Sequence, residues 1–151
     1  MKKIDNRLFS PIVQYIENRP LFVLIMAILI IGFVVYWDFF TFQKFYLFKD
    51  IGSDSLNASY PYFVHLSHYL REWGFPGWSF NVGLGQNILP FSLGDPFNDI
   101  LFILGADKVV YFVFYIEFIK ILLSGILFYL FLSLFSLNPI SCIISGLFYA
   151  F

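Results

Sequence analysis

The sequence predicts an all-α membrane protein that crosses the bilayer more than once and carries interfacial helices in a long first outer loop. Composition is the first observation behind this prediction. Of the 151 residues, 60% are hydrophobic and 13% are charged, whereas soluble domains have about 25% charged residues. The second observation is the pattern, because apolar runs flank one long polar interval at residues 49–97. A water-soluble fold of this size cannot bury so much apolar surface, so lipid is the expected surrounding.

The first membrane-spanning helix is expected at residues 21–40. Its first part carries no charge, and Tyr36 and Trp37 then supply an aromatic belt. The length agrees with the roughly 20 residues that a helix needs to cross the hydrocarbon core.

The charges near the N-terminus set the expected orientation. Cations dominate residues 1–20, namely Lys2, Lys3, Arg7 and Arg19. They predict a cytoplasmic N-terminus, so the loop at residues 41–107 is expected on the outside of the membrane. Within residues 1–20, a short interfacial helix that starts at Ser10 and Pro11 and a frayed charged tail are both compatible with the sequence.

Two helices are expected inside the outer loop. Asp54 or Ser55 can cap the first, which runs to Trp73 with apolar residues at three- and four-residue spacings, as in an amphipathic interfacial helix. Residues 78–82 are expected to be a short extended piece, and residues 83–85 a flexible bend.

The second outer helix and the remaining spans follow from local signals. Asp95 and Pro96 are typical of a helix start, so a short helix is expected from Phe97 to Leu104, with Gly105 ending it. A second spanning helix is expected at residues 108–135 and, after a tight turn, the start of a third at residues 139–151. That last segment is too short to cross a membrane, so the chain is expected to be the N-terminal part of a larger multi-pass protein.

Several kinds of site are disfavoured by the sequence. A net charge of -1 gives no basic field for nucleic acid. Cys142 is the single cysteine, which excludes an internal disulfide and a thiolate metal cluster. His65 and His68 have a spacing that can chelate a metal, but no second ligand set is visible, so polar-face histidines are the preferred interpretation. No metal site and no cofactor are assigned from the sequence, and a requirement for a divalent metal is left open.

Glu117 and Lys120 lie on one face of the second expected spanning helix. Counting from Lys108 puts Glu117 roughly 14 Å along the helix, near the middle of the bilayer. A carboxylate at this depth must be paired or must face a polar cavity. An ion pair with Lys120 and a cavity-lining role are therefore both open.

Four acidic residues of the outer loop are candidates for chemistry: Asp50, Asp54, Asp95 and Asp99. Asp95 is best explained as a helix cap before Pro96. Asp54 follows the first membrane helix closely, and an acid at the lipid boundary can act as a general base on a hydroxyl substrate. Asp50 is the nearest competitor.

Short motifs of the loop also occur together as a set: Asp54, Tyr60-Pro61-Tyr62-Phe63, Leu70-Arg71, Gly74-Phe75-Pro76-Gly77-Trp78, Gly83-Leu84-Gly85-Gln86-Asn87 and Asp95-Pro96-Phe97. With this set the chain resembles the N-terminal region of YfhO-family bacterial membrane proteins. The resemblance implies a GT-C-like glycosyltransferase of the cell membrane. Such an enzyme moves a sugar from a polyprenyl-phosphate donor to a cell-envelope polymer such as lipoteichoic acid.

The resemblance also implies site residues. Asp54 matches the catalytic acid in the first outer loop of GT-C enzymes, with Asp50 as the alternate. Substrate contacts are expected from Arg71, Tyr60, Trp78, Gln86, Asn87 and Asp95. Arg71 either contacts a phosphate or is a solvated interface cation. A transporter or flippase subunit that works through Glu117 and Lys120, and a non-catalytic membrane scaffold, are the alternative functions.

Overall fold

The structure is a computed structural model that describes residues 10–49, 54–74, 77–92 and 95–151. The described residues are mostly helical, with one small two-stranded sheet. Contacts divide the chain into two compact units, and each is described by itself: a first unit of Met1–Phe40 with Phe118–Phe151, and a second unit of Thr41–Glu117. The helix α7, Ala106–Ser133, begins in the second unit and ends in the first.

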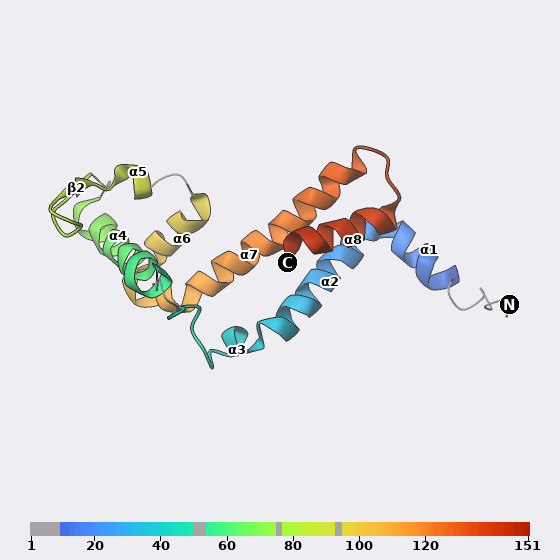
Figure 1. Cartoon of the computed structure of the whole chain (residues 1–151), viewed down its shortest axis with the longest axis horizontal. Coiled ribbons are helices and arrows are strands. Elements are labelled where there is room, and N and C mark those ends of the chain that lie inside the picture. The colour runs from blue at the N-terminus through green and yellow to red at the C-terminus, as the bar shows by residue number, and fades with distance from the viewer. Residues whose placement is uncertain (1–9, 50–53, 75–76, 93–94) are drawn as a thin grey trace. The chain divides into compact units, whose positions relative to one another are not determined.

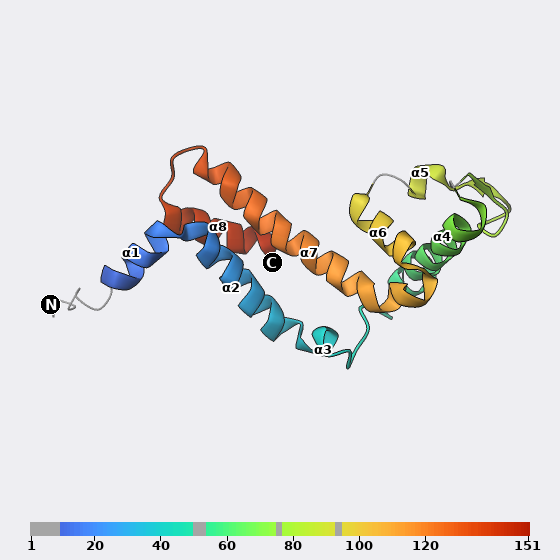
Figure 2. The same cartoon turned by 180° about the vertical axis from the view of Figure 1, so that it is seen from behind.

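The first unit is built from helices alone in its described part. They are α1 (Ser10–Asn18), α2 (Pro20–Val35), α3 (Trp37–Phe40), the C-terminal part of α7, and α8 (Pro139–Ala150). Figures 1 and 2 show α8 beside α7, with α2 against α8. The helix α1 agrees with the helix expected from Ser10, and its position at a membrane interface stays a prediction.

The single helix expected at residues 21–40 is divided in the structure. Tyr36 leaves the helical conformation, with φ -104° and ψ 23°, while its N–H still donates to Gly32 O. The Tyr36 carbonyl then accepts from the N–H groups of Phe39 and Phe40, which starts α3. The apolar sequence thus continues beyond Val35, the last residue of α2.

Among the described residues, α7 is the one helix that is both long enough and apolar enough to cross a membrane. Its 28 residues correspond to about 42 Å, compared with about 30 Å for the hydrocarbon core. The helices α2 and α8 are apolar but shorter.

Two glycines bring the backbones of α7 and α8 together in the first unit. A Cβ atom added at Gly146 would lie 2.9 Å from Gly125 O and 3.1 Å from Leu24 Cδ2. A Cβ atom at Gly125 would lie 2.6 Å from Ile28 Cδ1. Leu24 and Ile28 of α2 are fully buried in the same core, so the small residues allow α2 as well as α8 to pack closely.

The second unit packs helices around a short hairpin. Its elements are η1 (Ser55–Ser59, a π-helix), α4 (Tyr60–Trp73), β1 (Trp78–Ser79), β2 (Gln86–Asn87), α5 (Leu89–Ser92), α6 (Pro96–Leu104) and the start of α7. The strands β1 and β2 are antiparallel, with Trp78 opposite Asn87. Figure 2 shows α6 beside α4, and hydrogen bonds from Tyr62, His65 and Tyr69 hold the hairpin and Ile88 along α4.

The core of the second unit joins α4, α6 and α7. Its buried members are Leu66, Ile88, Leu101, Phe102, Val113 and Ile116. The predicted helix at residues 97–104 is confirmed: Asp95 Oδ1 accepts from Phe97 N–H at 2.9 Å, and Gly105, with φ 104°, ends the helix. The extended piece expected at residues 78–82 is confined to Trp78 and Ser79, because β2 offers only two partner residues.

Gly146→Val is expected to lower the free energy of unfolding of the first unit by about 1–3 kcal/mol, because the new methyl groups meet the Gly125 carbonyl, which is backbone and cannot rotate away. Valine is a better helix former than glycine, so any loss of stability in this variant must come from packing. The measurement is the thermal unfolding midpoint in detergent. Ile144→Val, an exposed position on α8, is the control and should not change the midpoint. Equal midpoints for Gly146→Val and the wild type would contradict the packing described above.

Candidate functional site

The start of the outer helical segment is fixed by Ser55. Its Oγ donates to Phe48 O at 2.9 Å and accepts from Phe48 N–H at 2.8 Å. This pair of bonds ties the first turn of η1 to the segment that follows α3. The Ser55 hydroxyl is therefore used in hydrogen bonds to the backbone of Phe48.

Asp54 stands directly before this turn and is exposed. Its backbone is already helical, with φ -62° and ψ -36°, and its side chain forms no cap hydrogen bond. The cap role that the sequence allowed for Asp54 is therefore wrong, because capping needs a non-helical residue whose side chain turns back to the first N–H groups. Asp50, the alternate catalytic residue, lies outside the described residues.

The segment after Asp54 is a π-helix, which is an uncommon conformation. The five residues of η1 lead directly into α4. Single π-turns are rare and occur frequently at functional sites, because they place side chains where an α-helix would not. Here Ser55 and Ser59, at the two ends of η1, both line the same cavity.

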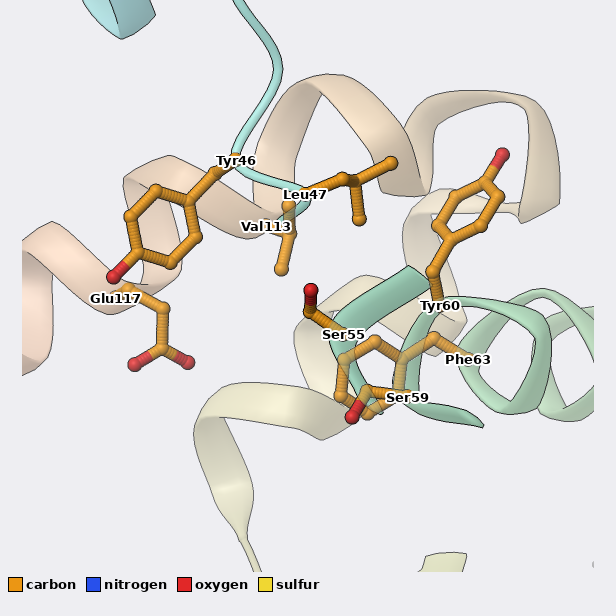
Figure 3. Close-up of a pocket in the computed structure, with 8 residues that line it drawn as sticks. All are labelled: Tyr46, Leu47, Ser55, Ser59, Tyr60, Phe63, Val113 and Glu117. Carbon is orange, nitrogen blue, oxygen red and sulfur yellow. The ribbon is translucent and has the colours of Figure 1, made fainter. Parts of the chain in front are cut away.

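This cavity has a volume of about 180 Å³ and lies beside η1, the segment that follows Asp54 (Figure 3). One part of its lining is polar and comprises the carboxyl group of Glu117 and the hydroxyl-bearing residues Tyr46, Ser55, Ser59 and Tyr60. The rest is apolar and comprises Leu47, Phe63 and Val113. Three segments that are distant in the sequence, residues 46–47, 55–63 and 113–117, therefore meet at one small site inside the second unit.

Glu117 is the charged member of the lining. It is half-buried and lies on α7. Figure 3 shows its carboxylate and the Ser59 hydroxyl facing the open space between α7 and η1, whereas the Tyr60 hydroxyl points away from it. Of the two roles that the sequence left open, the structure supports cavity lining, and the ion pair with Lys120 stays a prediction.

The hairpin is attached to α4 by side-chain hydrogen bonds. His65 Nε2 lies 2.9 Å from Ser79 Oγ, which is buried and also accepts from Asn81 N–H at 3.2 Å. Tyr69 donates its hydroxyl to Trp78 O at 3.2 Å. Burial lowers the pKa of His65, and the neighbouring charge of His68 lowers it further. In the part of the chain that is described, no three His, Cys, Asp or Glu residues are grouped as metal ligands.

The substrate-contact residues implied by the family resemblance are distributed over the second unit. Tyr60 lines the cavity with Glu117, whereas Gln86 borders a separate hollow with Tyr62. Trp78 is 56% exposed in the hairpin. Roles in substrate binding stay predictions for all of them.

The other three have evident structural contacts. Arg71 Nη2 donates to Leu104 O at 3.3 Å, Asn87 Oδ1 accepts from Leu89 N–H at 3.0 Å, and Asp95 caps α6. The bond from Arg71 uses one of the five N–H groups of a guanidinium, so it is compatible with a further anionic partner.

No protein-family profile matches the chain, and neither does any curated protein or solved structure. The function of the site is therefore inferred from the chemistry of the cavity and loop residues and from the resemblance to the YfhO family.

The second unit is expected to lose stability as the pH falls below about 6.5, the ordinary pKa of histidine. The folded state lowers the pKa of His65, so the unfolded state binds the proton more readily and protonation favours unfolding. The stability is complete above pH 6.5 and is lost as the pH falls through the lower pKa of the folded state. Thermal unfolding followed by tryptophan fluorescence at pH 7.5 and pH 5.5 measures the effect. His65→Gln keeps a polar group near Ser79 but does not titrate, so it should show a smaller pH dependence than His68→Gln.

Proposed function

We propose that this chain is part of a GT-C-like membrane glycosyltransferase, similar to the YfhO family, that transfers a sugar from a polyprenyl-phosphate donor to a cell-envelope polymer such as lipoteichoic acid. The observation that carries the proposal is the position of Asp54. It is an exposed carboxylate with no capping role, and the next residue, Ser55, lines a cavity whose open space is faced by the Glu117 carboxylate and the Ser59 hydroxyl (Figure 3). A general base at the edge of a hydroxyl-lined site suits the activation of an alcohol.

The proposed reaction is one displacement at the anomeric carbon. A hydroxyl oxygen of the acceptor forms the new bond to that carbon while the bond from the carbon to the donor phosphate breaks. Polyprenyl phosphate leaves with the electron pair, and Asp54 takes the proton of the attacking hydroxyl. No oxidant, reductant or cofactor is needed for this balance.

The surroundings of the site suit a lipid-linked donor. Large apolar side chains of the second unit are strongly exposed: Trp73 is 74%, Phe80 is 80%, Ile103 is 78% and Leu84 is fully exposed. Exposed tryptophans beside apolar groups are typical of a membrane interface. Arg71 is exposed on α4 and is the residue that we assign to the donor phosphate.

The proposal includes a multi-pass topology, with the N-terminus in the cytoplasm and the second unit outside the cell. It is supported by the cations before α2 and by the length of α7.

A transporter or flippase subunit is the second candidate function. Glu117 favours it, since a carboxylate that lines a cavity beside a helix able to span the membrane is a common element of ion and proton pathways. In that case transport by the complete protein would depend on Glu117, and no variant of Asp54 would affect it.

Cysteine labelling tests the topology. In a Cys142→Ser background, Trp78→Cys in intact cells should react with a maleimide that cannot cross the membrane, and Leu137→Cys should react only after the cells are opened. Both positions are exposed, at 56% and 48%, so a lack of reaction reports the side of the membrane and not burial. The opposite pattern would refute the orientation.

Asp54→Asn is expected to remove sugar incorporation in cells or vesicles that contain the complete protein, while abundance and topology stay the same. Asparagine is similar in size and has no capping bond to lose here, but it cannot accept the proton, and a general base contributes typically 10²–10⁴-fold in rate. The measurement is incorporation of labelled sugar into the envelope polymer.

Asp95→Asn should have a milder effect than Asp54→Asn, because asparagine caps helices about as well as aspartate. The matched control is Glu72→Gln, at an exposed acid of α4 to which no role is assigned. It should leave transfer nearly normal. If Asp54→Asn transfers normally and Asp50→Asn does not, the base is Asp50. Normal transfer by both variants would exclude a general base in this segment.

A further inference from the structure

We infer that the cavity beside α7 binds the hydroxyl-bearing end of the acceptor, a sugar or polyol group, and that Glu117 is the residue that holds it. The inference deepens the proposed function and rests on it for the identification of the bound group as the acceptor. Glu117 thereby has a binding role that is separate from the role of Asp54 as the general base.

The polar side of the cavity is suited to hydroxyl groups. An ionised carboxylate offers about four acceptor sites and no donor, so Glu117 binds groups that donate. Serine and tyrosine hydroxyls both donate and accept, and Ser59 faces the same open space as Glu117 (Figure 3). A ligand with several neighbouring hydroxyls can therefore donate to Glu117 and exchange hydrogen bonds with Ser59.

The charge of the lining selects against the donor phosphate. Glu117 is the only charged residue among the described residues of the lining, and it is negative. A phosphate in this cavity would face the Glu117 carboxylate, and the described part of the lining itself contributes no lysine or arginine. We therefore place the neutral acceptor, and not the phosphate of the donor, in this cavity.

The apolar side and the size also fit one sugar ring. Leu47, Phe63 and Val113 form a wall that matches the C–H face of a sugar, while the hydroxyl edge meets the polar residues. The cavity of about 180 Å³ is smaller than the roughly 300–1,000 Å³ of pockets for drug-sized ligands. It is suited to the end of a chain and not to a long polymer segment.

The position along the chain connects this cavity with the proposed reaction. Glu117 follows the start of α7 by eleven residues, or about 16 Å along the helix axis. Ser55 lines the cavity and is adjacent to Asp54, so a hydroxyl held by Glu117 lies in the site that begins next to the proposed base.

Photolabelling of the full chain in lipid nanodiscs tests the inference. The probe is an alkyl glucoside with a diazirine near the sugar, and the labelled peptides are identified by mass spectrometry. We expect labelling within residues 46–63 and 113–117. Competition by unlabelled alkyl glucoside should be strong, whereas alkyl phosphate and alkylammonium of equal chain length should compete weakly.

Glu117→Gln is expected to weaken probe binding about tenfold, since hydrogen bonds to a charged group are the stronger ones. Glu72→Gln is the matched control, because Glu72 is an exposed acid on α4 that does not line the cavity, and it should bind the probe like the wild type. If Glu117→Gln yields too little folded chain, Ser59→Ala at an exposed position takes its place and should weaken binding several-fold.

The inference is overturned if these variants bind like the wild type, if labelling lies elsewhere, or if alkyl phosphate or alkylammonium competes better than the glucoside. Labelling requires no sugar transfer, so Asp54→Asn should still bind the probe. Normal probe binding together with normal transfer by Asp54→Asn and Asp50→Asn would refute the proposed function and leave the sugar-binding cavity in place.

Discussion

Both hydrophobic cores of this chain depend on α7. In the second unit the helix supplies Val113 and Ile116, and in the first unit it supplies Tyr129. A helix satisfies its backbone hydrogen bonds within itself, which makes it suitable for crossing lipid and also for packing without help from a sheet. The remaining helices are shorter, and α2 and α8 acquire a buried face by packing in the same core as α7. Continuous helical structure through Glu117 also explains how a half-buried acid can be held beside a cavity.

In the second unit, hydrogen bonds from side chains to the backbone connect neighbouring segments, as backbone hydrogen bonds do in a sheet. Ser67 is buried in α4 and donates to Phe102 O at 3.0 Å, which joins α4 to α6. Ser55 and Tyr69 make comparable bonds to the backbone of the segment before η1 and of the hairpin. Carbonyl groups at the end of a helix and in irregular segments lack partners within their own element, and polar side chains of a neighbouring helix provide donors for them here. The unit can therefore be compact although its sheet has only two residues per strand.

The sequence predicted those helix boundaries that depend on interactions between neighbouring residues. The cap at Asp95, the end of α6 at Gly105 and the start of α8 at Asn138 and Pro139 each depend on residues within one turn. The sequence did not predict the division of the first apolar helix at Tyr36, because the residues on both sides of it are apolar. It also did not predict the strand β2 or the helix α5, because neither segment has a strong periodic pattern. Asp54 was assigned a possible cap because it precedes a helical pattern, and the bonds between Ser55 and Phe48 are tertiary contacts that no spacing shows. For the same reason the sequence marked Glu117 as a possible cavity residue but could not join it to Ser55, Ser59 and Tyr60.

The π-helical turn of η1 makes the site tolerant of a one-residue change in the length of the chain. Its hydrogen bonds skip one residue more than those of an α-helix, and Tyr60 N–H correspondingly reaches back to Ser55 O. Removing a single residue between Ser55 and Ser59 would let the segment relax into ordinary α-helix. Ser55 O would then accept from the same Tyr60 N–H in an ordinary α-helical hydrogen bond, so the residues before the deletion would keep nearly the same orientation relative to α4. A one-residue deletion in this turn would thus leave Asp54, Ser55 and the hydrophobic face of α4 in place, and relatives that lack one residue here would differ only in the side chains between Ser55 and Tyr60.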